Sequence, residues 1–157
     1  MPRRTDIIIE AVRADTAEAV GLIGELDSYL QSFPYPPESC HAFSVDKLVR
    51  EAVAFFMARV EWEPAGCGGV KLCGTEYGEV KRMYVRPTYR GLGLGKALLE
   101  HVAAYARERH VTVLRLETGI YQAEAIGLYE RCGFQRCPPF GEYVEDPMSV
   151  YFERTLV

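Results

Sequence analysis

The sequence lacks the patterns that mark metal-binding and disulfide-rich proteins. No Cys-x-x-Cys pair occurs among its five cysteines, and its three histidines are scattered along the chain. Without ligands at a recurring spacing, we expect no bound metal. The odd number of cysteines is typical of reduced thiols and favours a cytoplasmic location. These cysteines are Cys40, Cys67, Cys73, Cys132 and Cys137.

Long apolar runs and basic clusters are also missing. The longest apolar run, residues 52–58, is far too short to span a bilayer. The first residues contain no hydrophobic segment, so we expect no secretory signal. The net charge is −4 and the pI is near 5.5, and no basic cluster is visible beyond Arg3-Arg4. These features argue against a membrane or a nucleic acid as a partner.

The remaining composition is that of an ordinary soluble protein. The chain has 157 residues, of which 48% are hydrophobic and 25% are charged. This length suits one domain with a sizeable core. No repeat, low-complexity tract or linker divides it, so we expect a single domain over residues 1–157.

The first half of the chain predicts a strand, two helices and a loop. Ile7 to Val12 is typical of a strand. Asp15, followed three residues later by Glu18, predicts an N-cap and capping box for a helix that ends near Gln31. Residues 33–39 contain three prolines and must form a loop. Ser44 is expected to cap a short helix that runs to about Val49.

The rest of the chain predicts a sheet interleaved with helices. Three antiparallel strands are expected at 53–60, 65–73 and 79–86, and Gly66, Gly68 and Gly69 suggest a bulge or close packing. Leu114 and Leu116 should lie on one face of a later strand. The later elements are a helix at 93–109, a strand at 111–117, a helix at 122–132 capped by Gly133, and a final strand at 149–152. We therefore predict an α/β fold with a mixed, mostly antiparallel sheet and helices on both faces.

A glycine-rich turn, Arg90-Gly91-Leu92-Gly93-Leu94-Gly95-Lys96, lies between a predicted strand and a predicted helix. Glycine allows positive φ and close approach of a ligand to the backbone. The free N–H groups and dipole of a helix start favour an anion, so this turn could bind phosphate. The alternative for this segment taken alone is a tight connection with spare glycines.

Two known phosphate-binding motifs do not fit this turn. Its glycines alternate, which is not the spacing of the dinucleotide fingerprint, and Lys96 is followed by Ala97 rather than by Ser or Thr. A nucleotide-phosphate enzyme would also need an Asp for Mg²⁺, so that alternative is poorly supported.

Two motifs in register resemble the GNAT superfamily of N-acetyltransferases. Arg90-x-x-Gly93-x-Gly95 is similar to its R/Q-x-x-G-x-G/A loop. Downstream, Gln122-x-x-Ala125-x-x-Leu128-Tyr129-x-x-x-Gly133-Phe134 is similar to its second signature, N-x-x-A-x-x-L-Y-x-x-x-G-F. The resemblance covers residues 79–134 and implies the GNAT fold and acetyl-CoA as acyl donor.

The resemblance also assigns candidate residues for acetyl-CoA. The pyrophosphate would face the backbone of Gly91, Leu92, Gly93, Leu94, Gly95 and Lys96, with added charge from Arg90 and Lys96. The backbone of Met83, Tyr84 and Val85 would pair with the pantetheine arm like an added strand. Lys96 could instead be a solvated surface residue. Gln122 stands where the family has asparagine, which puts the usual hydrogen bond to the pantetheine arm in doubt.

Tyr129 matches the signature tyrosine and is the candidate general acid for the departing thiolate. Helical periodicity equally predicts a core aromatic on the inner face of the helix. Both roles are compatible, because the ring can pack while the hydroxyl reaches the site.

Glu79 is the first candidate for the general base that deprotonates the amine. It lies eleven residues before Arg90, an offset that resembles that of the family's histone-type lysine acetyltransferases. Strict strand alternation would place Glu79, Lys81, Met83 and Val85 on one face. Lys81 could therefore be only an ion-pair partner of Glu79. Glu117, which ends the adjacent strand, is the second candidate.

The acceptor is the least determined part of the hypothesis. By analogy with the family, residues 33–39 should lie over the acceptor pocket, and His41 could contribute to it. Cys132 and Cys137 are expected to be packing residues. Several acidic residues could line the cleft and would favour a cationic amine on a small molecule or amino acid. They are Glu79, Glu117, Glu142, Glu145 and Asp146.

Three alternatives stay open at this point. The acceptor could be a protein lysine or N-terminus, or the chain could be a non-catalytic acyl-CoA sensor. Dimerisation is common in the family, so a homodimer is compatible with the resemblance, although no interface is evident in the sequence.

Overall fold

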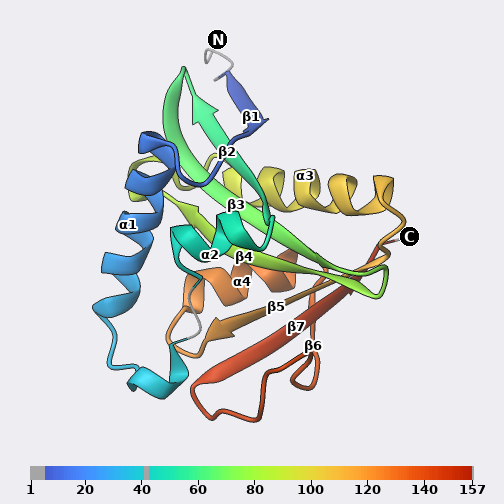
Figure 1. Ribbon diagram of the computed structural model, residues 1–157. Helices are drawn as coiled ribbons and strands as arrows, with labels where there is room; N and C mark the ends of the chain where they lie inside the picture. Colours follow the sequence, from blue (N-terminus) through green and yellow to red (C-terminus); the bar gives the residue numbers. More distant parts are fainter. Residues whose placement is uncertain (1–5, 41–42, 157) are drawn as a thin grey trace.

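The computed structural model describes residues 6–40 and 43–156 (Figure 1). The strands are β1 (Ile7–Ala11), β2 (Ala54–Val60), β3 (Glu63–Cys73), β4 (Tyr77–Val85), β5 (Val113–Gly119), β6 (Gln135–Arg136) and β7 (Ser149–Thr155). The helices are α1 (Ala17–Gln31), α2 (Val45–Arg50), α3 (Leu94–Glu108) and α4 (Ala123–Arg131), with 3₁₀ turns η1 (Pro37–Ser39) and η2 (Pro87–Tyr89).

The strands form one sheet in the order β1-β2-β3-β4-β5-β7-β6. Every neighbouring pair is antiparallel except β4 and β5, which are parallel. This arrangement confirms the predicted mixed, mostly antiparallel α/β sheet. The three-stranded meander of β2, β3 and β4 is confirmed as well, whereas the two-residue strand β6 was not predicted.

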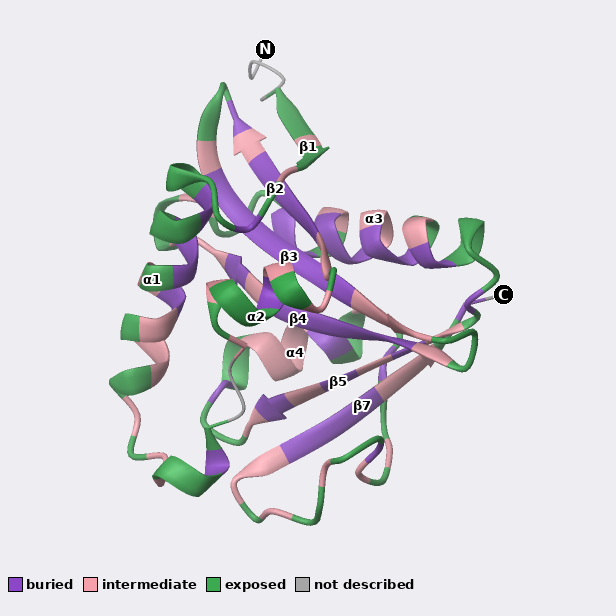
Figure 2. Cartoon of the chain, in the orientation of Figure 1, coloured by how far each residue is buried: buried purple, intermediate pink, exposed green. Residues whose placement is uncertain are grey.

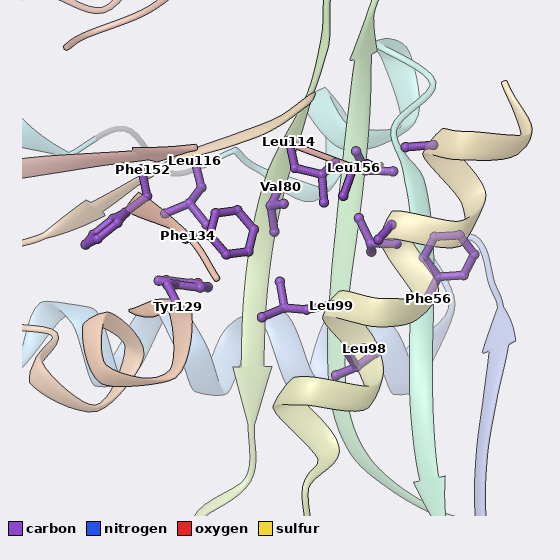
Figure 3. Packing of buried hydrophobic residues seen from close by; sticks show 14 of the residues in the cluster. Phe56, Val80, Leu98, Leu99, Leu114, Leu116, Tyr129, Phe134, Phe152 and Leu156 are labelled. Atoms are coloured by element: carbon purple, nitrogen blue, oxygen red, sulfur yellow. The ribbon is translucent and has the colours of Figure 1, made fainter. Parts of the chain in front are cut away.

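Helices cover both faces of the sheet and enclose two hydrophobic cores. On one face, α1 and α2 pack on β2, β3 and β4 around Leu22, Ile23, Leu48 and Met57. On the other face, α3 and α4 pack on the sheet around Leu98, Leu99, Leu114 and Phe152. Figure 2 shows the buried sides of α1 and α3 turned toward the sheet, and Figure 3 shows the α3-side core. Each fully buried aliphatic side chain contributes roughly 1.5–3 kcal/mol.

The start of α1 differs from the prediction. Thr16, not Asp15, is the N-cap, and its side chain accepts a hydrogen bond from the Ala19 N–H. The Asp15 carboxylate is held instead by the guanidinium of Arg13, and Glu18 pairs with Arg59. The predicted capping box is therefore wrong, because arginines engage both carboxylates.

The start of α2 and the side-chain alternation of β5 agree with the sequence. Ser44 caps α2 by accepting a hydrogen bond from the Lys47 N–H at 3.1 Å. Leu114 and Leu116 of β5 both lie in the α3-side core, as predicted. The alternating strand pattern and the capping serine are local signals, so the neighbouring residues suffice to determine them.

A β-bulge interrupts β4 at Arg82. Lys81 pairs with Gly69 and Tyr84 pairs with Cys67, so three steps along β4 match two along β3. Arg82 lies within this stretch and has a φ of 56°, in the left-handed region that is uncommon for residues other than glycine. An extra residue of this kind shifts the following side chains to the opposite face.

The bulge overturns the predicted alternation of β4. Met83 and Val85 pack against the α3-side core, whereas Tyr84 lies in the α1-side core. Glu79 and Lys81 line cavities together with Phe43 and Tyr143, on the side of α2. The prediction that Met83 and Val85 share a face with Glu79 is therefore wrong, since the bulge lies between them.

Within residues 6–40 and 43–156, no helix has the length and apolar character needed to cross a membrane.

Cys67 provides a test of the α1-side core. Its side chain is fully buried, and burial raises the pKa of its thiol from 9.0 to about 12. We expect iodoacetamide at pH 8 to modify exposed Cys40 quickly and Cys67 only after denaturation, as measured by peptide mass spectrometry. Above pH 9 the unfolded chain loses the proton that the folded chain keeps, so stability should fall between pH 9 and 12. Equal labelling of the two thiols in the native protein would contradict this packing.

Candidate active site

The candidate site is a cleft formed where β4 and β5 separate. The two strands pair at only two register positions, Gly78 with Leu114 and Glu79 with Arg115. Beyond them the strands diverge, as Figure 1 shows. The cleft has a volume of about 360 Å³. Its walls include Asp27, Tyr35, Glu79, Lys81, Glu117 and Tyr129.

The divergence leaves the backbone of β4 beyond Glu79 without a partner on the β5 side. Met83, Tyr84 and Val85 occupy this stretch, and Met83 also lines the cleft. An extended ligand could therefore pair with this edge as an added strand.

The glycine-rich turn leads into α3 with the geometry of an anion site. Gly91 and Gly93 have φ values of 84° and 81°, which a side chain would disfavour. Gly93 is the N-cap of α3. Because glycine has no side chain, no side-chain hydrogen bond satisfies the first N–H groups of this helix. A Cβ at Gly91 or Gly93 would meet no atom within 4 Å. The turn therefore presents an open surface to an anion.

The two cations of this turn are placed differently. Arg90 donates to the Glu124 carboxylate at 2.9 Å and to the Val85 carbonyl at 3.2 Å, which ties the turn to α4 and β4. Lys96 is exposed on the first turn of α3. Gly95 is a packing position, because a Cβ there would lie 2.7 Å from Leu128 of α4.

Tyr129 lies on α4 and is buried to 6% exposure. Its ring packs against Phe134 and Phe152 with centroid distances of 5.7 and 6.2 Å (Figure 3). Burial raises the pKa of its phenol well above the usual range. The residue is thus both a core aromatic and a wall of the cleft, and its phenol stays protonated near neutral pH.

Glu79 belongs to a buried triad with Lys81 and Tyr143. Its Oε2 atom lies 2.6 Å from the Lys81 ammonium and accepts a 2.6 Å hydrogen bond from the Tyr143 hydroxyl. Lys81 also donates to that hydroxyl at 3.1 Å. Burial lowers the pKa of Lys81, although the neighbouring Glu79 opposes this shift. The ion pair that the sequence left open is therefore present, and one oxygen of Glu79 is fully engaged.

Glu117 faces the same cleft from β5. It is half-buried and accepts a 2.8 Å hydrogen bond from the Ser149 hydroxyl of β7. Burial is the main cause that raises the pKa values of the Tyr129 and Tyr143 phenols; the Glu117 carboxylate adds to the shift of Tyr129, and Glu79 and then Glu117 add to that of Tyr143. Both candidate bases thus lie at one cleft with Tyr129.

The proline-containing segment after α1 closes part of the cleft. Phe33, Tyr35 and Cys40 line it, which agrees with the predicted position over the pocket. The Tyr35 hydroxyl accepts hydrogen bonds from the Tyr121 backbone N–H at 2.9 Å and from the Gln122 side chain at 3.1 Å. Gln122 therefore uses its amide to hold this segment.

Aromatic contacts add to this closure. Phe33 stacks on Tyr121 with a centroid distance of 6.1 Å and an interplanar angle of 7°. Tyr35 also contacts Tyr121, at 5.0 Å between centroids. The segment after α1 is thereby joined to the connection between β5 and α4.

Cys132 and Cys137 do not line the cleft. His41 lies outside the described residues. Burial raises the pKa values of the Cys132 and Cys137 thiols, which makes them poor nucleophiles and fits packing roles. Among residues 6–40 and 43–156, no group of three or more His, Cys, Asp or Glu side chains could hold a metal ion.

Sequence reasoning missed Tyr143 and the anchoring role of Tyr35. Tyr143 lies in the loop before β7 and reaches Glu79 from 64 positions away. Tyr35 contacts Gln122 from 87 positions away in the sequence. Neither tyrosine belongs to a motif. The available signal for Tyr35 was its partner Gln122, which stands where the family has asparagine.

The family model for the GNAT acetyltransferases matches residues 23–134 of this chain. The chain belongs to the GNAT acetyltransferase family. The match spans the second half of α1, the diverging strands β4 and β5 and both signature segments, so it includes most residues that line the cleft but not Tyr143.

Curated relatives agree with this membership. The protein named IAA acetyltransferase from Azospirillum brasilense is 45% identical over 139 residues, covering 87% of this chain and 90% of that protein. The uncharacterised N-acetyltransferase YsnE of Bacillus subtilis is 40% identical over 123 residues, covering 77% of this chain and 82% of that protein. The chain is therefore an N-acetyltransferase of the GNAT family.

Solved structures show the same fold. A candidate acyl-CoA N-acyltransferase from Klebsiella pneumoniae is 35% identical with a TM-score of 0.81, covering 96% of this chain and 98% of that chain. PaiA N-acetyltransferase from Thermoplasma acidophilum, crystallised with coenzyme A, has a TM-score of 0.77 at 18% identity, covering 96% and 99%. The latter likeness concerns the fold alone.

Gly119 should be intolerant of any side chain. A Cβ at this position would lie 2.1 Å from the Tyr35 hydroxyl oxygen, so Gly119→Ala must displace Tyr35. We expect a loss of about 1–3 kcal/mol in unfolding free energy and faster proteolysis near residues 33–40. Gly24→Ala is the matched control, because a Cβ there meets nothing within 4 Å and alanine favours helix. Equal denaturation midpoints for Gly119→Ala and the wild type would contradict the described closure.

Proposed function

We propose that this GNAT N-acetyltransferase moves an acetyl group directly from acetyl-CoA to the amine of a small molecule or amino acid. The observation that carries the proposal is the cleft between β4 and β5, which is lined by both Tyr129 and Glu117. A proton donor and a proton acceptor on facing walls are what direct transfer to an amine requires.

Residues on one edge of the cleft would hold the donor. The open turn from Gly91 to Lys96 suits the pyrophosphate, because its first N–H groups and the helix dipole favour negative charge. The unpaired edge of β4 suits the pantetheine arm, and a backbone N–H there could stabilise the oxyanion. Arg90 holds the turn against Glu124 and supplies positive charge beside it.

Glu117 is the better placed general base. An acceptor amine is largely protonated at neutral pH, with a pKa near ~10.4 for a lysine-type amine, so it must lose a proton before attack. The Oε2 atom of Glu79 already accepts from Lys81 and Tyr143, so this carboxylate is engaged in holding two neighbouring side chains, and the amine proton would have to go to its other oxygen. The corresponding role for Glu79 is to hold Lys81 and Tyr143 at the wall of the cleft.

Tyr129 is suited to protonate the departing thiolate. Within residues 6–40 and 43–156, its hydroxyl forms none of the side-chain hydrogen bonds found, and the residue lines the cleft, where a polar ligand atom could bind this group. Its raised pKa keeps the proton available near neutral pH. A substrate sulfur in the cleft is the natural partner for this hydroxyl.

The closure of the cleft favours a small acceptor over a protein segment. Tyr35 binds the start of α4 on one side, and Tyr143 binds Glu79 and Lys81 on the other. An extended polypeptide would need a groove open along its length. Here Tyr35 and Tyr143 both bind residues that line the cleft. Small amines fit a cavity of about 360 Å³.

Tyr129→Phe tests the proposed acid. Thiol release from acetyl-CoA should be measured with small amines, amino acids and lysine peptides as acceptors. We expect the variant to lower kcat by about 10²–10⁴-fold on the active acceptor class while the affinity for CoA changes little. Tyr105→Phe, on α3 in the core contact with Phe56, is the control and should keep wild-type kcat. Turnover on lysine peptides alone would refute the small-acceptor proposal.

The two glutamates can be separated by their different consequences. Glu117→Gln should lower kcat by about a hundredfold or more, without a comparable loss of stability. Glu79→Gln removes the counter-charge of buried Lys81, so we expect it to lower the unfolding free energy by about 3–5 kcal/mol. Steady-state kinetics and urea denaturation of both variants measure this difference. A larger fall in kcat for Glu79→Gln at unchanged stability would make Glu79 the base.

A further inference from the structure

Three of the four lysines in this chain converge on one phenyl ring. The ammonium groups of Lys81, Lys47 and Lys71 lie 3.8, 4.2 and 5.7 Å from the ring centroid of Phe43. They come from β4, α2 and β3, so the cluster is created by the fold and not by the sequence order. Like charges gathered in this way repel one another, which favours a nearby anion.

The lysines line a second cavity beside the cleft. It has a volume of about 600 Å³ and includes Lys47, Lys71, Lys81, Tyr77 and Tyr143 among its walls. It shares Cys40, Phe43, Glu79, Lys81 and Tyr143 with the cleft, so the two spaces adjoin at the Glu79–Lys81 pair.

The carboxylates in this cavity do not accept from every N–H donor of the three ammonium groups. Glu51 binds Lys71 at 2.5 Å but lies 3.8 Å from Lys47, which is too long for a hydrogen bond. Lys81 is paired with Glu79 at 2.6 Å. Glu142 also lines the cavity, from an exposed position, and forms none of these ion pairs. The ammonium of Lys47 therefore has donors to spare at the wall.

The two adjoining spaces differ in their charges. The cleft is lined by three carboxylates, from Asp27, Glu79 and Glu117, and by the cations Lys81 and Arg82. Arg82 is itself bound to Asp27 at 2.5 Å. In the second cavity three ammonium groups face two paired carboxylates and the exposed Glu142. A ligand that extends across the boundary would meet the carboxylate of Glu117 at one end and the ammonium groups of Lys47 and Lys71 at the other.

We infer that the second cavity binds a carboxylate of the acceptor, so that the enzyme acetylates amino acids whose carboxylate lies at a distance from the reacting amine. This inference rests on the proposed function, because the amine end is placed in the cleft beside Glu117. Lys47 and Lys71 would donate to the carboxylate, and Phe43 would contact the chain between the two charged ends.

Matched acceptors test the inference. The panel pairs ω-amino acids, from β-alanine to 6-aminohexanoate, with n-alkylamines of equal carbon number, and free L-amino acids with their carboxamides. We expect kcat/KM to be at least about tenfold higher for the carboxylate member of a pair, since charge-assisted hydrogen bonds are strong. The chain length with the highest kcat/KM would report the span between the two ends. Equal use of both members at every length would overturn the inference.

Variants of the two outer lysines locate the effect. Lys47→Met and Lys71→Met keep the aliphatic stem and remove the ammonium. Each should lower kcat/KM for the carboxylate acceptor about tenfold and leave the matched alkylamine unchanged. Arg50→Met, on the same helix as Lys47 but outside the cavity walls, is the control and should leave both values unchanged. A carboxylate preference that survives in both lysine variants would also overturn the inference.

A binding measurement separates this inference from the proposed function. The panel acids are titrated by calorimetry into the wild type and the two lysine variants, each with CoA present. Binding that depends on Lys47 and Lys71 without any turnover would support the carboxylate site and refute the transfer reaction. Turnover of alkylamines without binding of any acid would support the transfer reaction and refute the carboxylate site.

Discussion

The bulge at Arg82 is the constraint on which the site depends. Its left-handed φ of 56° is held by the guanidinium, which reaches across to α1 and binds Asp27 and the Ile23 carbonyl. Because one extra residue is accommodated there, Glu79 and Lys81 face the cavities while Met83 turns to the α3-side core. The same stretch of β4 has no partner on the β5 side, so its backbone is available to a ligand. The bulge at Arg82 therefore determines which β4 side chains line the cavities, and it lies in the stretch of β4 whose backbone is open to a ligand.

The cleft that this strand borders is closed by side chains from distant segments. Tyr35 binds the β5–α4 connection, Tyr143 binds Glu79, and Arg90 binds Glu124. Each contact joins segments that are far apart in the chain, and a hydrogen bond of this kind contributes at most about 0.5–1.5 kcal/mol. The contacts are individually modest. Their combined effect is to fix the walls of the cleft before a substrate arrives, which lowers the ordering cost of binding.

The features that the sequence could predict are those determined by neighbouring residues. The Ser44 cap, the alternation of Leu114 and Leu116 and the left-handed glycines of the turn at 91–93 all follow from local patterns. The bulge could not be predicted, because Arg82 has no intrinsic preference for positive φ and its support comes from α1, 55 positions away. The prediction for the start of α1 failed partly for the same reason. Asp15 and Thr16 are both good caps, and the Arg59 guanidinium that engages Glu18 comes from 41 positions away. Motif resemblance located Tyr129, and the position of Glu117 at the end of a predicted strand located that residue, whereas Tyr143 required the folded chain.

The Glu79–Lys81 pair lies at the boundary of the two cavities, and its burial limits how the site can vary. Both side chains are less than a tenth exposed, so loss of either partner would leave a charge buried without compensation. Substitution of Glu79 or Lys81 alone should therefore lower the stability of the fold. Lys47 and Lys71 are about half and a third exposed, and their removal costs far less in desolvated charge. The inner pair is therefore the costlier one to change, and the outer lysines can be replaced with less loss of stability.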